Sequence, residues 1–500
     1  MYHDVIQAAL QGWAVMLSWP NIIYPIAGML LAMVFSVFPG LTGATLMALA
    51  IPLTAHWDPI PVMLIYGAFL GGATFMGSVT AILFNIPGRP SNAATLLDGH
   101  ALARRGEAKT AIGCAAAASA LGSTFGVIIL ILLIPIMQQV LLFFGPAELL
   151  LLILWGLITI VALSRESMLK GLAIAGFGLM VSFVGLDPRT AESRYTLGLA
   201  WLEDGMPLVP VFLGLYALAE LFGLMREQRV TISGSRDATK LSGSLRKGIG
   251  AIFRYPGVFL RSSVIGTVIG IIPGVGGTVA SFVAYGHAAQ LAKKGDHEFG
   301  KGDIRGVLAP EAANDAKDGG ALVPALAFGL PGGTGTAMLL AVLAVHGFEP
   351  GREMLSSNLV PLFVLIWSLF LTNWLTSLLG ISLVGMFARL TTIRTEVLIA
   401  PLIVIATIGA YLYRGQESDV VIAYVFAGLG YMMKVFDWPR IPMMIALVLG
   451  PLFERNLQLV LRLQELGRID FFARPLVVAF LLLSVSGLLV PLFRRNKTRP

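Results

Sequence analysis

Charged residues are scarce in this sequence. Asp, Glu, Lys and Arg make up 13% of the 500 residues, whereas soluble domains carry roughly a quarter, and the mean hydropathy is +0.82. This composition excludes an ordinary soluble protein and indicates a polytopic membrane protein. The hydrophobic runs also lack the period-2 alternation of an outer-membrane barrel. Because backbone groups in lipid must be satisfied within each segment, we expect an all-α fold.

Cysteine is nearly absent, and so are catalytic motifs. Cys114 stands alone, which excludes an internal disulfide, and no spacing of Cys and His is typical of a metal site. The sequence lacks a nucleophile elbow and an HExxH motif, and the run Gly332-Gly333-Thr334-Gly335 lacks the lysine and the preceding strand of a phosphate loop. We therefore expect no enzymatic activity, no metal and no cofactor, and an ion gradient rather than ATP as the source of energy.

The sequence also lacks a large net charge. The net charge of +7 is modest, and it lies in loops. Such charges indicate how the chain is oriented in the membrane and do not indicate nucleic-acid binding. The N-terminus lacks the basic region and the small-residue cleavage site of a signal peptide, so we expect the first segments to be retained.

What the sequence does contain is apolar runs close to the length of about 20 residues that spans a membrane. The clearest lie at 112–137, 140–163, 168–184, 208–225 and 477–493. With the broken runs described below, we expect about 10 to 13 transmembrane segments.

Several apolar runs are interrupted by Pro-Gly pairs. In the run 21–53 the break is Phe38-Pro39-Gly40-Leu41-Thr42-Gly43, and in 60–98 it is Asn85-Ile86-Pro87-Gly88. Proline removes a helix hydrogen bond and glycine tolerates many backbone angles, so we predict two shorter helices meeting at the first break. A kink in one continuous helix is the alternative.

A basic segment divides the chain. Hydropathy collapses between residues 226 and 255, where basic residues far outnumber acidic ones, so the positive-inside rule predicts a cytoplasmic loop. We predict an N-terminal membrane half at 1–225 and a C-terminal membrane half at 256–500. The basic residues of the loop are Arg226, Arg229, Arg236, Lys240, Arg246, Lys247 and Arg254.

The Pro-Gly pairs recur in the second half. Pro39-Gly40 corresponds to Pro273-Gly274, and Pro87-Gly88 to Pro331-Gly332. The loop 56–61 has no Lys or Arg whereas its counterpart 291–305 has four, which favours opposite sides of the membrane and hence an inverted repeat. A parallel duplication or a chance recurrence of Pro-Gly is the alternative.

Paired, interrupted helices at matching places are a pointer to a transporter's binding site. Helix ends within the membrane expose free N–H groups that suit a carboxylate and free carbonyls that suit sodium. Close helix packing is the alternative role for the same small residues. The candidate substrate-binding residues are Pro39, Gly40, Thr42, Asn85, Pro87, Gly88, Ser91, Asn92, Pro273, Gly274, Gly276, Gly277, Thr278, Pro331, Gly332, Thr334 and Thr336.

Polar residues beside the last break are candidates for ion coupling. An acid at membrane depth is costly and usually functional, so Asn314, Asp315 and Asp318 are candidates for cation coordination or proton relay. A wet vestibule at a helix end is the alternative setting for them. Glu311, just after Pro310, is expected to complement a helix N-terminus. Arg89 could face an anionic substrate or snorkel at the surface.

At these motifs the sequence resembles the large membrane subunit of the tripartite tricarboxylate transporters. The resembling stretches include FPGLTGATLMALAIPLT, AILFNIPGRPSNAATLLDGHALARRGEA, IPGVGGT and GVLAPEAANDAKDGGALVPALAFGLPGG. The resemblance implies a multi-pass secondary transporter of the bacterial inner membrane. Its implied partners are a small membrane subunit and a periplasmic binding protein that delivers a carboxylate such as citrate. Met76 and Asp315 depart from the pattern expected of such a subunit.

The resulting expectation is import of a carboxylate by symport with sodium or protons. Two other classes of function remain open at the level of sequence. An uncoupled channel would carry flux that ignores the cation gradient. A membrane scaffold of a larger complex would tolerate replacement of Asn85 or Thr334 without loss of uptake.

Overall fold

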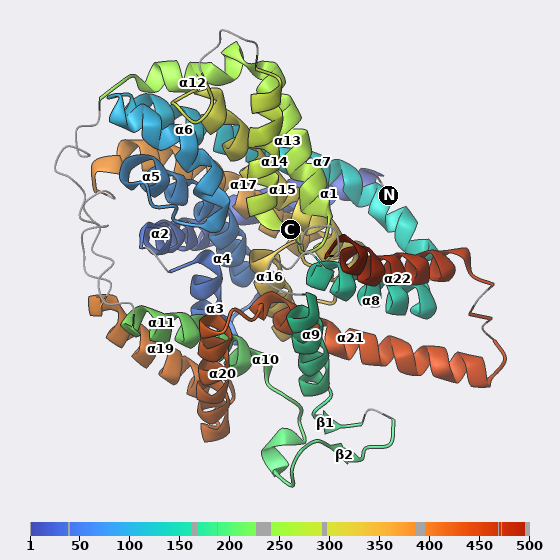
Figure 1. Ribbon diagram of the computed structural model, residues 1–500. Helices are drawn as coiled ribbons and strands as arrows, with labels where there is room; N and C mark the ends of the chain where they lie inside the picture. The colour runs from blue at the N-terminus through green and yellow to red at the C-terminus, as the bar shows by residue number, and fades with distance from the viewer. Residues whose placement is uncertain are drawn as a thin grey trace.

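The computed structural model describes residues 2–38, 41–162, 168–187, 189–226, 242–292, 298–386, 396–468, 470–471 and 473–495 (Figure 1). In this part of the chain the regular structure is helical, apart from one short two-stranded ribbon. The all-α fold expected from the composition is confirmed.

The elements up to the ribbon are α1 (Tyr2–Leu17), α2 (Ile23–Val37), α3 (Gly43–Thr54), α4 (Pro59–Gly72), α5 (Thr74–Phe84), the 3-10 turn η1 (Pro90–Asn92), α6 (Ala93–Arg104), α7 (Ala108–Val140), the 3-10 turn η2 (Leu141–Phe143), α8 (Pro146–Ala162) and α9 (Met168–Ser182). The next are β1 (Gly185–Leu186), β2 (Ser193–Arg194), the 3-10 turn η3 (Ala200–Leu202), α10 (Leu208–Phe212), the π-helical turn η4 (Leu213–Leu218) and α11 (Ala219–Arg226).

The second part contains α12 (Leu245–Arg254), α13 (Pro256–Ile271), α14 (Gly276–Gln290), α15 (Arg305–Phe328), α16 (Thr334–Val345) and α17 (Leu359–Ser382). It closes with α19 (Glu396–Arg414), α20 (Glu417–Val435), α21 (Arg440–Glu465) and α22 (Pro475–Arg495).

The predicted spans coincide with helices. The five apolar runs fall on α7, on α8, on α9, on the continuous segment from α10 to α11, and on α22. Among the described residues, seven helices are long and apolar enough to cross a membrane, and several shorter apolar helices accompany them. These findings confirm a polytopic membrane protein, while the total number of crossings stays a prediction.

Both breaks of the first half separate helices. α2 ends at Val37 and α3 begins at Gly43, so two helices rather than one kinked helix occupy this run. Pro39 and Gly40 themselves lie outside the described residues. α5 ends at Phe84, and Asn85 follows in the left-handed region with φ of 59°. The second half repeats this ending, since α15 stops at Phe328 and Gly329 follows with φ of 70°.

Two buried stretches, α4–α5 and α15, form the centre of the molecule. α15 lies between α7 and α13, and α4 lies between α2 and α17. Glycines bring these helices into backbone contact. A Cβ atom at Gly126 of α7 would lie 2.4 Å from the carbonyl oxygen of Ala316, and one at Gly67 of α4 would lie 2.6 Å from that of Leu365. Such small-residue contacts let membrane helices approach closely.

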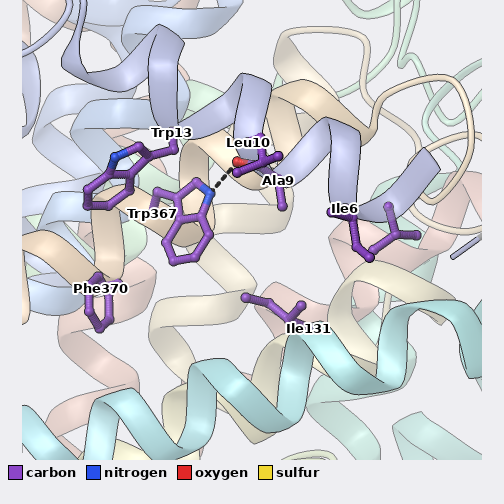
Figure 2. A pocket seen from close by; sticks show the side chains of 8 residues that line it. Ile6, Ala9, Leu10, Trp13, Ile131, Trp367 and Phe370 are labelled. Carbon is purple, nitrogen blue, oxygen red and sulfur yellow. Dashed lines mark hydrogen bonds between the residues drawn. The ribbon is translucent and has the colours of Figure 1, made fainter. Parts of the chain in front are cut away.

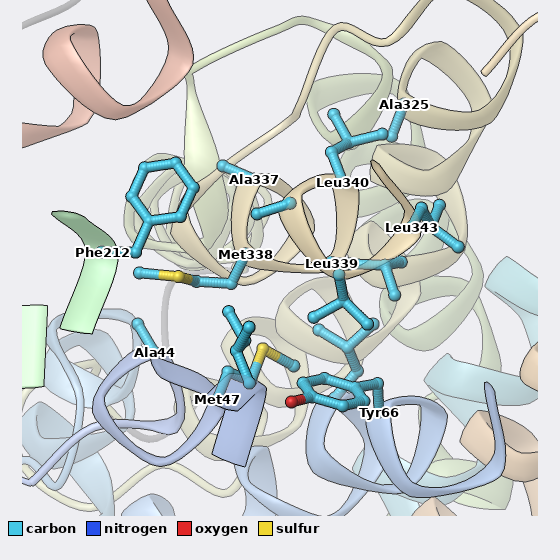
Figure 3. Packing of buried hydrophobic residues seen from close by; sticks show 14 of the residues in the cluster. Ala44, Met47, Tyr66, Phe212, Ala325, Ala337, Met338, Leu339, Leu340 and Leu343 are labelled. Atoms are coloured by element: carbon cyan, nitrogen blue, oxygen red, sulfur yellow. The ribbon is translucent and has the colours of Figure 1, made fainter. Parts of the chain in front are cut away.

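The short helices after the breaks cross from one half to the other. α3 packs against α16, while α14 packs against η1 and α6. Figure 3 shows the first of these contacts, where Ala44 and Met47 of α3 lie beside Ala337 and Met338 of α16. This crossing is apolar, so it contributes packing rather than ligands. The crossing of α14 with η1 and α6 is the polar one, as described below.

Two other segments differ from simple loops. The end of the predicted basic loop forms α12, which packs on α7. Residues 227–241 of this loop lie outside the described part of the chain, and so do residues 293–297 of the loop at 291–305. Between α9 and α10, Gly185 pairs with Arg194 in an antiparallel ribbon. The backbone N–H groups of Arg189 and Thr190 donate to Asp187 in this ribbon and lower the pKa of its carboxyl.

Candidate functional site

Glu311 lies inside the molecule and not at a helix end. α15 begins at Arg305, so Glu311 is well past its first turn, and the expectation that it complements the helix N-terminus is wrong. The side chain is completely buried. Its carboxylate accepts hydrogen bonds from Ser78 Oγ, which lies 2.7 Å from each oxygen, and from Thr95 Oγ1. Asn92 Nδ2 donates in turn to Ser78 Oγ at 2.6 Å.

This hydrogen-bonded group, Glu311 with Ser78, Asn92 and Thr95, is held together by the break after α5. The backbone N–H of Gly88 donates to the carbonyl of Gly77 at 3.2 Å, which folds the break back onto α5. A Cβ atom at Gly77 would lie 2.3 Å from Asn92 Oδ1, so this approach requires glycine. The break therefore sets the position of the donors that face Glu311.

Of this group, the sequence predicts Asn92 as a binding residue, whereas it predicts a helix-end role for Glu311 and no role for Ser78. One signal was available, because Asn92 and Thr95 are three residues apart and share a helix face. The residue that they face cannot be predicted from this spacing, since Glu311 is 216 residues from Thr95 in the chain.

Asp315 and Asn314 form a second buried polar group on α15. Asp315 is completely buried and Asn314 is 1% exposed, so their surroundings are the packed interior and not a wet vestibule. Asn373 Nδ2 of α17 donates to Asp315 Oδ1 at 2.8 Å. The other carboxylate oxygen of Asp315, the side-chain oxygen of Asn373 and both polar atoms of Asn314 have no hydrogen-bond partner. Buried polar atoms of this kind favour a ligand or water.

Lys317 and Asp318 are half-buried and form an ion pair with each other. The first turn of α14 lies directly on this part of α15. A Cβ atom at Gly277 would lie 2.5 Å from Lys317 Cε and 2.7 Å from Asn314 Oδ1. The break at 272–277 is thus brought to the acidic part of α15, and Asp318 has its charge balanced by its neighbour.

Asp98 links the two halves near this region. Its buried carboxylate accepts hydrogen bonds from the hydroxyl of Tyr285 at 2.9 Å and from the backbone N–H groups of Gly300, Gly302 and Asp303 at 3.0, 2.7 and 2.8 Å. Four donors satisfy one carboxylate without any cation. We assign Asp98 a structural role, which is to fix the loop before α15 against α6.

In each half the two breaks lie side by side. A Cβ atom at Gly88 would lie 3.0 Å from the carbonyl oxygen of Ser36 at the end of α2. In the second half the N–H of Gly274 donates to the carbonyl of Pro331 at 3.3 Å. The candidates Pro87, Gly332 and Gly276 belong to these paired breaks, and Gly276 has φ of 72°. In both halves, therefore, the first break of the half lies against the second.

Other candidates have local partners. Thr42 Oγ1 accepts from the N–H of Thr45 at 3.2 Å and caps α3. Thr336 Oγ1 accepts from the N–H of Gly333 at 3.1 Å at the start of α16. Arg89 is half-buried and donates to Thr74 Oγ1 at 3.2 Å, so it does not snorkel at the surface. The remaining polar candidates, with no side-chain hydrogen bond described, are Asn85, Ser91, Thr278 and Thr334. Ser91 is buried, Thr278 and Thr334 are half-buried, and Asn85 is exposed.

An apolar groove lies apart from these groups. Figure 2 shows it between α1, α7 and α17, with Trp13 and Trp367 in edge-to-face contact at 5.2 Å and Trp367 Nε1 donating to the carbonyl of Ala9 at 2.8 Å. Its lining has no charged side chain, so it offers nothing to bind a carboxylate. The residues that line the groove are Val5, Ile6, Ala9, Leu10, Trp13, Ile131, Trp367 and Phe370.

Comparison with known proteins places the chain in a family. The model of the tripartite tricarboxylate transporter TctA family matches residues 22–445. An uncharacterized 52.8 kDa protein of the TAR-I ttuC' 3' region of Agrobacterium vitis is 29% identical over 489 residues, covering 98% of this chain and 96% of that protein. An uncharacterized protein of the TAR-II ttuC' 3' region of the same organism is 29% identical over 235 residues, covering 46% of this chain and 97% of that protein.

No solved structure matches this chain. The family match spans both halves, including every break and the polar residues of α15. The chain therefore belongs to the tripartite tricarboxylate transporter TctA family.

Proposed function

We propose that this chain is the permease subunit of a tripartite transporter in the bacterial inner membrane that imports a tri- or dicarboxylate by symport with a cation. Family membership supports transport of a tricarboxylate and an assembly with other subunits. In this proposal a small membrane subunit accompanies the chain, and a periplasmic binding protein delivers the substrate. The chain acts as a transporter and not as an enzyme.

The observation that carries the coupling to a cation is Asp315. Its carboxylate is completely buried, and the donor in its described hydrogen bond is the neutral amide of Asn373. An ionised carboxylate in the membrane interior is costly unless a positive charge accompanies it. Oxygen atoms of Asp315, Asn373 and Asn314 without partners are suited to a sodium ion or a proton. Asp318, paired with Lys317, contributes less to this site.

The breaks supply the substrate contacts in this proposal. The first turn of α14 touches Asn314 and Lys317, so a carboxylate held by free N–H groups at this turn would lie near the coupling residues. Arg89 follows the break after α5 and offers a positive charge to the same anion. Binding of the anion and of the cation would then favour each other electrostatically.

Alternating access follows from the two-fold repetition. We propose that the halves form an inverted repeat whose paired breaks face outward and inward in turn. The left-handed residues Asn85 and Gly329 at matching helix ends support the repetition. So does the reciprocal packing, in which α7 of the first half packs on α15 of the second, while α17 of the second half packs on α4 of the first.

The test is uptake of labelled citrate into proteoliposomes that contain the chain with its small membrane subunit and binding protein. Accumulation is expected with an inward sodium or proton gradient and not without one. Asp315→Asn should lose accumulation, because the coupling charge is removed while the size of the side chain is kept. Asp58→Asn is the matched control, since Asp58 is exposed and makes no capping hydrogen bond.

Two results would contradict the proposal. Citrate flux that depends on neither the sodium gradient nor the proton gradient would indicate an uncoupled channel. Absence of uptake with both partners present, together with unchanged complex formation, would indicate a scaffold subunit.

A further inference from the structure

We propose that Glu311 is a proton-binding site, separate from Asp315, that is closed by the first half of the chain and opens to water during the transport cycle. The inference rests on the proposed function for its place in a cycle, but the state of the carboxyl can be measured without transport. The hydrogen-bonded group of Glu311 with Ser78, Asn92 and Thr95 carries the argument.

The first step is burial without a cation. Glu311 is completely buried, and its described partners, Ser78 and Thr95, are neutral hydroxyls. Two hydroxyl donors do not replace the hydration of a carboxylate, and removing a charge from water without a counter-charge costs several kcal/mol or more. A proton on Glu311 removes that cost. Asp98 shows the contrast, since four donors surround it, three of them backbone N–H groups.

The second step is the set of charges around Glu311. Neither α5 nor α16 carries a titratable residue. On α7 the buried thiol of Cys114 donates to the carbonyl of Ile304 at 3.8 Å, and Asp315 lies one turn further along α15 and repels a second negative charge. The remaining charged or titratable groups on elements that pack on α15 are Arg89, Asp98, His100, Arg104, Lys109, Arg246, Lys247, Arg254, Arg261, Tyr285, His287, Arg305, Lys317 and Asp318.

None of the described hydrogen bonds and ion pairs joins those groups to Glu311. Arg89 donates to Thr74, Arg261 to the carbonyl of Gly257, and Tyr285 to Asp98. Arg305 is paired with Asp303, and Lys317 is paired with Asp318. Four of the positive charges near α15 are thus engaged with other groups, and no described hydrogen bond or ion pair brings any of the listed cations to Glu311. A proton is the counter-charge that this geometry leaves for Glu311.

The third step distinguishes a proton from a sodium ion. Ser78 Oγ is 2.7 Å from both oxygens of Glu311, and Thr95 Oγ1 is closer still to one of them. The separation of 2.7 Å from Ser78 Oγ is that of an O–H···O hydrogen bond, which ranges over about 2.5–3.0 Å. Oxygens that share a metal ion stand further apart, because the ion occupies the space between them. The group fits a proton, whereas Asp315 and Asn373 each have a buried oxygen without a hydrogen-bond partner that could contact a cation.

The fourth step is the route of the proton. Ser78, Asn92 and Thr95 belong to the first half, on α5, η1 and α6, whereas Glu311 belongs to the second. Movement of one half against the other would separate the hydroxyls from the carboxyl and admit water. The carboxyl O–H bond then breaks, the proton passes to water, and the carboxylate remains until a proton from the opposite side restores the O–H bond.

Infrared spectroscopy of the purified full-length chain tests the protonation directly. At neutral pH the wild type is expected to show the carbonyl stretch of a buried protonated carboxyl that is lost in Glu311→Gln. The control Glu349→Gln should leave the band unchanged, since Glu349 is exposed and paired with Arg455. A spectrum in which Glu311→Gln removes no protonated-carboxyl band at neutral pH would overturn the inference.

A second variant guards against a folding defect in Glu311→Gln. Thr95→Val removes one hydrogen bond from Glu311 and leaves its proton in place, so the band is expected to shift in frequency without losing intensity. Thr95→Ser should restore the wild-type position. A band whose frequency does not change in either Thr95 variant would not belong to Glu311, and the inference would fail.

Transport assays then place the proton in the cycle. In proteoliposomes with both partner subunits, Glu311→Gln is expected to lose accumulation of citrate driven by a pH gradient but to keep exchange of internal for external citrate, since exchange needs no net proton release. Wild-type accumulation by Glu311→Gln would overturn the coupling role. A wild type without any citrate transport would instead contradict the proposed function, while the infrared result would stand or fall by itself.

Discussion

The stretch α4–α5 in the first half and the helix α15 in the second half have the same setting but different side chains. Each lies between an earlier helix of its own half and a helix of the other half, and each is joined to its neighbours through glycines. Each ends in a left-handed residue, Asn85 or Gly329, two positions before a Pro-Gly pair. The shared features concern the backbone and its packing.

The difference is one of chemistry. From Pro59 to Phe84 the first stretch has no charged residue, and its buried polar groups include the hydroxyls of Thr74, Ser78 and Thr80. α15 holds the carboxylates of Glu311 and Asp315. One half thus presents neutral donors and the other presents acids. The comparison teaches that repeated backbone geometry can position a site whose chemistry is divided between the two copies.

The largest expected effect tests the shared packing. Gly126→Val on α7 and Gly67→Val on α4 should each destabilise the protein by about 1–3 kcal/mol or more, because the new side chain meets the backbone of a neighbouring helix. Gly428→Val in α20 is the control, since no atom lies within 4 Å of a Cβ there. The measurement is thermal unfolding of the purified chain in detergent. A loss at Gly126 but not at Gly67 would break the likeness of the two stretches.

The second prediction concerns the residues after the two helix ends. Gly329→Ala should cost about 1–2 kcal/mol, because φ of 70° is strained for a residue with a Cβ atom. Asn85→Gly should be neutral or slightly stabilising, since it relieves the same strain at φ of 59°.

Gly333→Ala is the matched control for the second prediction. Gly333 lies in the same break as Gly329, but its φ of −179° is extended and suits any residue. Thermal unfolding again measures the effect. Equal costs for Gly329→Ala and Gly333→Ala would show that the left-handed backbone at Gly329 does not govern the stability of this break.

Much of the fold could be predicted from the sequence because its signals are local. Apolar runs of membrane length give helices wherever backbone groups must be satisfied in lipid, which is why the runs at 112–137 and 208–225 lie on helices. The separation of α2 from α3 follows from proline and glycine at residues 39 and 40. The relative orientation of the two halves across the membrane depends on a few loop charges and stays a prediction.

The site is harder to predict from the sequence than the fold, because its contacts join residues that are far apart in the chain. Glu311 meets Ser78 across 233 positions of the sequence, and Asp98 meets Gly302 across 204. No periodicity in the sequence indicates such pairs. The sequence therefore predicts a helix-end role for Glu311 and no role for Asp98. For Asp315 the sequence left a buried and a wet setting open. In the structure Asp315 is buried, because the packing of α17 brings Asn373 to its carboxylate.

The smallest expected effect separates capping from ligand binding at the two short helices that pack together. In α3 the capping is reciprocal, because Thr42 Oγ1 accepts from the N–H of Thr45 and Thr45 Oγ1 accepts from that of Thr42. In α16 Gly333 has no side chain, so Thr336 alone provides the hydroxyl. Thr42→Ala should therefore cost about 1 kcal/mol, and Thr336→Ala about half of that.

Thr42→Ser keeps the cap and is the control, with stability close to that of the wild type. The decisive measurement pairs thermal unfolding with the KM for citrate uptake. If capping is the whole role of the hydroxyl, loss of stability occurs with an unchanged KM, because a properly folded α3 presents the same N–H groups. A raised KM in Thr42→Ala at full stability would instead assign this hydroxyl to the substrate, and the apolar crossing of α3 with α16 would then border the binding site.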